Sequence, residues 1–291
     1  MQERAAATST TSARVDRGIG GLSDRDLQRA AGCGRVVIGD GQNGSRITDL
    51  YQRSPVRIMF PRIDGRRGEE AVLVNTSGGI AGADRLEYTV TALPQADISV
   101  TTQAAEKVYR ALKEPAWIVT KLNVCPTAKL AWLPQETIVF DGARMSRATD
   151  IDLSSGAEVL GLEWLVFGRA AHGEHVVAGQ ITDSWRVRKD GRLIFADCFH
   201  ATDETFAQLR RTALLHACNA IGTLIYFGPN GDAKLDLLRD LAGSLPCRCA
   251  VTSVSELIIV RFAAEGSSTL RAALCLLLEQ LRFGVPKMWS C

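Results

Sequence analysis

The sequence has few features of a membrane or secreted protein. No apolar run approaches the ~20 residues that cross a bilayer. The N-terminus is rich in Ala, Thr and Ser and lacks the apolar segment of a secretory signal. Eight cysteines are scattered along the chain, and no Cys-x-x-Cys pair occurs. We therefore expect reduced thiols, no membrane association and a cytoplasmic location.

Signals for nucleic-acid or nucleotide binding are also weak. The formal net charge is +2 and no long basic run exists, so we expect no nucleic-acid partner. The glycine-rich stretch Asn75–Asp84 follows an apolar segment, as phosphate-binding loops do, but it lacks a Gly-Lys-Ser/Thr motif. Phosphate loops lead into a helix, whereas the next segment alternates like a strand. We favour a structural turn whose glycines let other segments approach closely, with a nucleotide loop as the alternative.

The chain does contain enough apolar surface for a large core. Of its 291 residues, 46% are hydrophobic and 23% are charged, the composition of a globular protein. Residues 1–20 hold too little apolar surface to offset the entropy of ordering, so we expect a disordered tail. We expect a β-rich body over residues 21–200 and a smaller α/β part over 201–291 on the same domain. Helical spacing in that part predicts helices over 206–221, 232–241 and 267–283.

A repeat of about thirty residues organises the β-rich body. Each unit consists of a strand, a turn built on Pro or Gly, an alanine and a second strand. The aligned alanines are Ala96, Ala128 and Ala157. Repetition at this spacing predicts strands stacked in a β-helix-like or solenoid-type array. Because the period is not strict, three hairpins of a large sandwich are the alternative.

The stretch Leu130–Arg144 holds polar groups in an apolar context. Its apolar residues alternate as in a half-buried strand, and Pro134 interrupts the ladder. Asp141-Gly142 predicts a tight hairpin turn. Glu136 lies between the break and the turn. Its carboxylate lies either on the solvent face or inside the protein, and the pattern is compatible with both.

Two further features raise the question of a metal site. His172 and His175 form a His-x-x-His pair with Glu174 between them, a set of groups that binds transition metals. On a glycine-flanked loop, two solvent-exposed histidines are the simpler interpretation. Cys291 is a metal ligand, a reactive thiol or an exposed tail residue, and we favour the last of these.

Five motifs occur in a fixed order along the chain. They are Asn75-Thr76-Ser77-Gly78-Gly79 with Gly82 and Asp84, Thr101–Lys107, Trp132–Ala143, Phe167–Glu174, and Pro286-Lys287-Met288-Trp289. Together they resemble the UreD, or UreH, family of urease accessory proteins, and the resemblance runs from about Ser54 to the C-terminus. Two departures from the usual pattern occur: Ala83, where another glycine is usual, and the pair Lys287-Met288, where Arg-Val is usual.

The resemblance implies a scaffold rather than an enzyme. Members of this family have a broad β-helix-like fold with few helices, which agrees with the repeat. They join UreF and the GTPase UreG, bind apo-urease and help to deliver nickel to its active site. For this chain the resemblance implies UreF, UreG and apo-urease as partners, and a dimeric assembly through the UreF/UreG complex. It also implies Ni²⁺ as transported cargo, with no tightly bound cofactor.

We expect nickel to move through a water-filled passage lined by weak ligands. Successive oxygen or imidazole ligands release an ion that a thiolate cage would trap. A row of buried carboxylates also lowers the desolvation cost of a divalent cation. The candidates are Glu136 and Asp141 in the central motif and Glu163 in the third repeat, followed by Glu106 and Asp84. Each has a plainer interpretation as a solvent-face or turn residue, above all Asp141 in its Asp-Gly turn.

Two other functions stay open from the sequence. One is a metal-dependent hydrolase that uses Glu136, Asp141 and the His172/His175 pair, although a nucleophile, a base and an orienting group are not evident as a set. The other is a binding scaffold of an unrelated assembly with no metal role.

Overall fold

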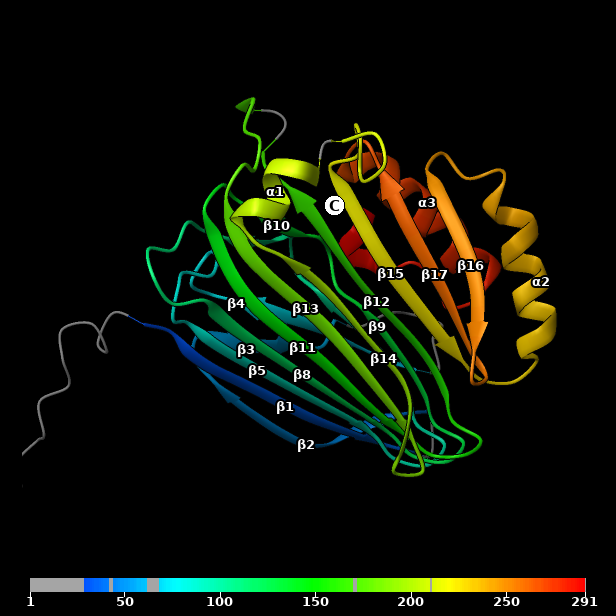
Figure 1. The fold of residues 1–291 in the computed structure, drawn as a ribbon. Coiled ribbons are helices and arrows are strands. Elements are labelled where there is room, and N and C mark those ends of the chain that lie inside the picture. The colour runs from blue at the N-terminus through cyan, green and yellow to red at the C-terminus, as the bar shows by residue number, and fades with distance from the viewer. Residues whose placement is uncertain (1–28, 42–43, 62–67, 170–171, 210, 291) are drawn as a thin grey trace, which may run out of the picture.

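The protein is built from two large β-sheets packed face to face, with helices on the outer face of one of them (Figure 1). The computed structural model describes residues 29–41, 44–61, 68–169, 172–209 and 211–290. The expected disordered tail and Cys291 lie outside these ranges.

The first sheet has the strand order β14 (Arg192–Ala201), β13 (Gly179–Lys189), β11 (Ala143–Leu153), β8 (Ala116–Val124), β5 (Arg85–Ala92), β1 (Ala31–Gly39), β2 (Arg46–Arg53). The second has the order β16 (Arg248–Val254), β17 (Leu257–Ala264), β15 (Ala220–Phe227), β12 (Glu158–Phe167), β9 (Lys129–Leu133), β6 (Asp97–Thr102), β4 (Glu69–Asn75), β3 (Val56–Met59). Two short strands, β7 (Glu106–Val108) and β10 (Thr137–Val139), extend it beside β12.

The helices are α1 (Asp203–Leu209), α2 (Gly231–Ala242), α3 (Ser267–Gln280) and the 3-10 helix η2 (Lys287–Ser290). Figure 1 shows α2 and α3 beside β15, β17 and β16, which extend the second sheet. Within the ranges that the structure describes, no helix has the length and apolar character needed to cross a bilayer.

The chain winds back and forth between the two sheets. β5, β8 and β11 lie in the first sheet, and the strands that follow their turns, β6, β9 and β12, lie in the second. Within each sheet, the successive strands of this path pair in parallel. Hairpins would pair the two strands of one unit with each other. The mostly β, solenoid-type stack predicted from the repeat is therefore confirmed, and the three-hairpin alternative is wrong.

The repeated alanines occupy equivalent turns between the sheets. The amides of Ala96, Ala128 and Ala157 each donate to the carbonyl three residues earlier, at 3.0–3.1 Å. Each alanine is only 1% exposed. A methyl group is small enough for one turn to stack on the next, so a sequence repeat becomes a spatial repeat.

Burial along each strand follows from which faces of the sheet are covered. β8 alternates buried and more exposed residues, because one face of the first sheet meets the core. β12 is buried along nearly its whole length, because the first sheet covers one face of the second sheet and the helices cover the other. The leucine face predicted for α3, which includes Leu270, Leu274 and Leu277, packs into the outer of these two cores.

Asp141-Gly142 does not form the predicted hairpin. Gly142 has a φ of +74°, but the strands on either side of the turn lie in different sheets. β10 pairs in parallel with β7 and β12, and β11 pairs in parallel with β8 and β13. The prediction is wrong because a short turn motif does not distinguish a hairpin from a corner of a solenoid.

The helix predicted over residues 206–221 is also wrong in part. α1 ends at Leu209, turns follow, and β15 begins at Ala220. β15 pairs with β12 and β17 along its length. Tertiary pairing in the sheet outweighs a weak helical pattern at this point.

The glycine-rich stretch Asn75–Asp84 is a structural turn, as expected. It leads into strand β5, and a Cβ on Gly79 would collide with the ring of Tyr109. Ala83 in the same turn has a φ of +68°, a conformation that glycine adopts without strain. This conformation gives a physical reason for the glycine that is usual at this position.

We predict that Ala83→Gly stabilises the protein by about 0.5–1 kcal/mol. Glycine removes the Cβ strain of the left-handed conformation, and its larger unfolded-state entropy offsets part of the gain. Ala128 is not at positive φ, so Ala128→Gly is the matched control and should destabilise. Urea denaturation measures both, and equal destabilisation by the two changes would contradict the strain at Ala83.

Candidate functional site

A charged cluster lies between the two sheets. Arg147 on β11 is only 4% exposed, and its guanidinium binds two carboxylates. Its Nε and Nη2 donate to Asp183 Oδ1 and Oδ2 at 2.8 and 2.6 Å, and its Nη1 lies 2.6 Å from Glu163 Oε2. Asp183 is the neighbour of Arg147 in the first sheet, whereas Glu163 lies on β12 in the second. Arg147 therefore joins the two sheets through buried charge.

Hydrogen bonds complete the environment of Glu163. Its Oε1 accepts from Trp132 Nε1 at 2.8 Å and from Thr149 Oγ1 at 3.3 Å. Burial raises the pKa of Glu163, and the charge of Arg147 opposes this rise. Burial alone would lower the pKa of Arg147, but Asp183 and Glu163 raise it, so the guanidinium stays charged. One cation therefore faces two carboxyl groups, so the cluster holds more acids than cations.

Polar side chains continue from this cluster along the inner face of the second sheet. Arg147 Nη1 also donates to Thr137 Oγ1 at 2.9 Å, and Thr137 on β10 is the register neighbour of Glu106 on β7. Asn75 Nδ2 donates to both oxygens of Glu106, at 3.1 and 3.2 Å. Burial raises the pKa of Glu106 to about 7. Burial raises the pKa of Tyr88 as well, and the charges of Glu106 and Glu163 add to this rise, which places Tyr88 near both acids.

A side cavity of about 220 Å³ reaches the charged cluster. Glu163, Asp183 and Asp197 contribute its carboxylates. Its walls come from β12, β15 and β17 of the second sheet and from β13 and β14 of the first. Arg261 also lines the cavity and pairs with Asp197 at 2.8 Å, with 51% of its side chain exposed. This ion pair lies where the cavity meets solvent.

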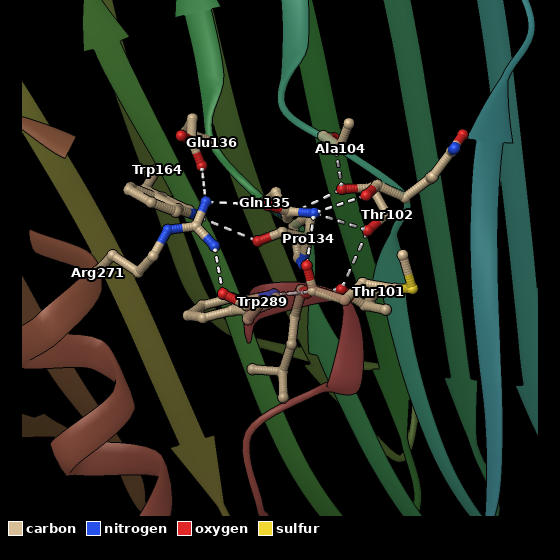
Figure 2. A network of polar contacts seen from close by, with 12 residues as sticks. Thr101, Thr102, Ala104, Pro134, Gln135, Glu136, Trp164, Arg271 and Trp289 are labelled. Atoms are coloured by element: carbon tan, nitrogen blue, oxygen red, sulfur yellow. Dashed lines mark hydrogen bonds and ion pairs between the residues drawn. The ribbon is translucent and has the colours of Figure 1, made fainter. Parts of the chain in front are cut away.

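Glu136 lies inside the protein, on the opposite face of the second sheet from Glu163. It is 8% exposed. Figure 2 shows it facing the guanidinium of Arg271, a residue of α3. Arg271 Nη2 donates to Glu136 Oε2 at 2.5 Å and to Gln135 Oε1 at 2.9 Å. The sequence pattern left both orientations open, and the structure places this carboxylate in an ion pair between a helix and a sheet.

Asp141 and Asp84 anchor turns. Asp141 Oδ1 accepts two backbone amides at 2.9 and 3.1 Å, and its Oδ2 accepts Arg110 Nη2 at 2.8 Å. Burial opposes the effect, but these donors hold the pKa of Asp141 below its ordinary value. Each oxygen of Asp84 accepts one backbone amide at 2.8 Å. The contacts of both residues are therefore those of turn residues, which is the plainer of the two interpretations.

The three acids singled out from the sequence lie in three different surroundings. Glu163 is bound by Arg147 between the sheets, Glu136 by Arg271 beneath α3, and Asp141 by Arg110 at a corner of the solenoid. The structure instead brings Glu163 together with Asp183 and, through Thr137, with Glu106.

Sequence reasoning missed Arg147 and Asp183. Both lie in strands whose alternating charges resemble a solvated face. The phase of the alternation was the signal: Arg147 stands in phase with the buried Met145 and Ile151, and Asp183 in phase with the buried Trp185. A charged residue in the inward phase of a strand is a buried polar group that requires a partner.

The His172/His175 pair lies exposed, and Arg169 takes up the neighbouring carboxylate. Arg169 donates to both oxygens of Glu174, at 2.8 and 3.0 Å. Among the residues that the structure describes, no three His, Cys, Asp or Glu side chains are grouped to hold a metal ion. A metal-dependent hydrolase would need Glu136 and Asp141 close to the two histidines. The described part of the chain does not bring these residues together at a metal site.

The geometry defines a class of protein: a solenoid-type β body with acids and one arginine between its sheets. The model of the UreD urease accessory protein family matches residues 30–290. The chain is 40% identical over 267 residues to the urease accessory protein UreD of Mesorhizobium japonicum, covering 90% of this chain and 95% of that protein. It is 38% identical over 286 residues to that of Xanthobacter autotrophicus, covering 98% of each. The chain belongs to the UreD family of urease accessory proteins, and membership implies a role in urease maturation.

We predict that Glu106→Gln stabilises the protein increasingly as the pH rises. Below the pKa that Glu106 has in the unfolded chain, its carboxyl is protonated in both states and does not lower the stability. As the pH rises to about 7, the pKa of Glu106 in the folded protein, ionisation favours the unfolded chain more and more, and the loss of stability is largest above that pH. Between pH 5 and pH 8 the variant should gain up to about 2–3 kcal/mol over the wild type. Thermal unfolding across this range measures the gain. The exposed Glu265→Gln is the control, and a pH-independent effect of Glu106→Gln would refute the prediction.

Proposed function

We propose that this chain serves urease maturation as a passage for nickel. In this proposal it acts with UreF and the GTPase UreG, in the cytoplasm, and hands Ni²⁺ to apo-urease without catalysing a reaction itself. Nickel is the cargo, and no tightly bound cofactor takes part. Family membership and the polar row between the sheets support the proposal.

The observation that carries the proposal is the excess of carboxyl groups over cations buried between the sheets. Burying an ion costs several kcal/mol unless it is well paired. Arg147 compensates one of the two carboxylates that it binds, and Glu106 adds a third acid with a raised pKa. Acids whose burial costs stability are candidates for function.

These acids suit brief contacts with a divalent cation. Carboxylate and hydroxyl oxygens hold nickel less firmly than thiolates do. Because the pKa of Glu106 is about 7, its proton leaves readily near neutral pH, and an arriving cation takes its place. The cavity lined by Glu163, Asp183 and Asp197 offers space between this row and the surface.

Among the residues predicted to line the passage, Glu163 and Glu106 belong to this row. Glu136 and Asp141 lie outside it and Asp84 anchors a turn, and the roles of these three as nickel contacts stay predictions. The alternative, a binding scaffold without a metal role, does not explain why these acids are buried. No arrangement among the described residues favours the hydrolase alternative over the passage.

We predict that Glu163→Gln lowers the nickel content of urease matured with this chain by about tenfold, equivalent to about 1.4 kcal/mol in the barrier to passage. Glutamine keeps an acceptor for Trp132 and Thr149, and Asp183 still pairs with Arg147, so the fold should survive. The measurement is nickel per urease active site in a urease-bearing host that lacks the native gene.

The control is Glu265→Gln, at an exposed position, which should leave the nickel content unchanged. Co-purification of UreF, UreG and urease with each variant shows whether the complex is intact. Full nickel loading by a folded Glu163→Gln chain in an intact complex would overturn the passage and favour the scaffold alternative.

A further inference from the structure

Two polar networks lie back to back across a single layer of strands. The segment 135–137, which leads into β10 and includes its first residue, presents one network on each side. On the outer side, Gln135 and Glu136 accept hydrogen bonds from Arg271. On the inner side, Thr137 accepts one from Arg147, the centre of the charged cluster. One short segment of backbone therefore belongs to both networks.

Strand β12 has the same two-sided arrangement. Glu163 points inward to Arg147, whereas the next residue, Trp164, points outward. Trp164 Nε1 donates to the carbonyl of Pro134 at 3.0 Å, and the guanidinium of Arg271 lies 5.5 Å from its ring. The outer network thus contacts both chain segments that carry inner residues.

The end of the chain completes the outer network (Figure 2). Arg271 Nη1 donates to the carbonyl of Trp289 at 3.2 Å, and Gln135 Nε2 donates to that of Met288 at 3.3 Å. The indole of Trp289 is buried and donates to Thr101 Oγ1 and to a backbone carbonyl of β9, both at 3.2 Å. We call Arg271, Met288 and Trp289, with Gln135 and Glu136, the C-terminal latch.

We propose that Arg271 is a positioning residue for the buried acids, acting through the C-terminal latch on the segment that carries Thr137. The inference rests on the proposed function, because it assigns the latch the task of holding the passage in shape. It also assigns Glu136 a role as the charge partner of Arg271.

Backbone contacts provide the mechanical connection. The amide of Glu106 donates to the carbonyl of Glu136 at 2.8 Å, and β7 pairs with β10 from Glu106 and Thr137 onward. A shift of Glu136 towards solvent therefore moves Thr137 and the backbone of Glu106 with it. Opening the layer in this way exposes the paired backbone amides of β7 and β10 to water, and exposed amides exchange hydrogen faster.

Latch and ligand make different demands on Glu136. A nickel ligand requires a carboxylate at this position. The ion pair of the latch requires opposite charges at positions 136 and 271, whichever residue carries the positive one. Exchanging the two charges separates these roles.

The test compares Arg271→Met, Glu136→Arg, Arg271→Glu and the exchanged pair Glu136→Arg with Arg271→Glu, all in the full chain. Arg271→Met removes the charge but keeps an apolar side chain against Trp164. It therefore tests the inference even if the variants with a reversed charge do not fold. Arg239→Met, an exposed position on α2, is the control. The first readout is the hydrogen-deuterium exchange rate of the backbone amides of β7 and β10, which requires no urease.

We expect Arg271→Met to speed this exchange several-fold and to lower urease nickel several-fold, with Arg239→Met unchanged. The exchanged pair should recover part of what either single reversal loses, because glutamate at position 271 restores the ion pair but cannot donate to Gln135 or Trp289. Wild-type exchange rates and full nickel loading in Arg271→Met would overturn the inference, as would an exchanged pair that folds but recovers neither property. Normal loading by Glu163→Gln would instead refute the proposed passage, while the exchange rates would still test the positioning by Arg271.

Discussion

The structure depends on how one arginine is kept charged between two sheets. Arg147 is nearly inaccessible to water, so its charge persists only because Asp183 and Glu163 face it at hydrogen-bonding distance. One partner lies in its own sheet and the other in the facing sheet, so the ion network fixes the separation and alignment of the two layers. A purely apolar interior would provide stability without this constraint. The buried charge is the feature that packing alone does not explain.

The solenoid path makes this arrangement possible, because a strand in the second sheet is covered on both faces. Its inward residues face the first sheet and its outward residues face α3 and the end of the chain. Neighbouring residues, such as Glu163 and Trp164, therefore enter different networks. Parallel strands covered on both faces are normally almost entirely apolar. Here β10, β11, β12 and β13 each contribute a buried polar side chain between the sheets, namely Thr137, Arg147, Glu163 and Asp183. Burying these groups costs stability, and it also gives the interior groups that can take part in chemistry.

Local sequence signals predicted the parts of the fold that rest on local physics. The alanine turns at Ala96, Ala128 and Ala157 and the leucine face of α3 are cases of this kind. Partners distant in sequence were not predictable: Arg271 lies 135 residues after Glu136, and no pattern joins them. Arg147 was overlooked because alternating charges usually mark a solvated face, although its phase with Met145 was informative. Asp141-Gly142 was misread because a turn motif carries no information about which sheet follows.

The most direct measurement removes the whole charged cluster at once. Arg147→Met, Glu163→Gln and Asp183→Leu together leave no unpaired ion, and glutamine keeps the acceptor for Trp132. Replacing a buried ion network with uncharged groups of similar size is often neutral or stabilising. We predict a triple variant that folds with an unfolding free energy close to that of the wild type but yields urease depleted of nickel. A folded triple variant that yields fully nickel-loaded urease would contradict a functional role for the buried charge.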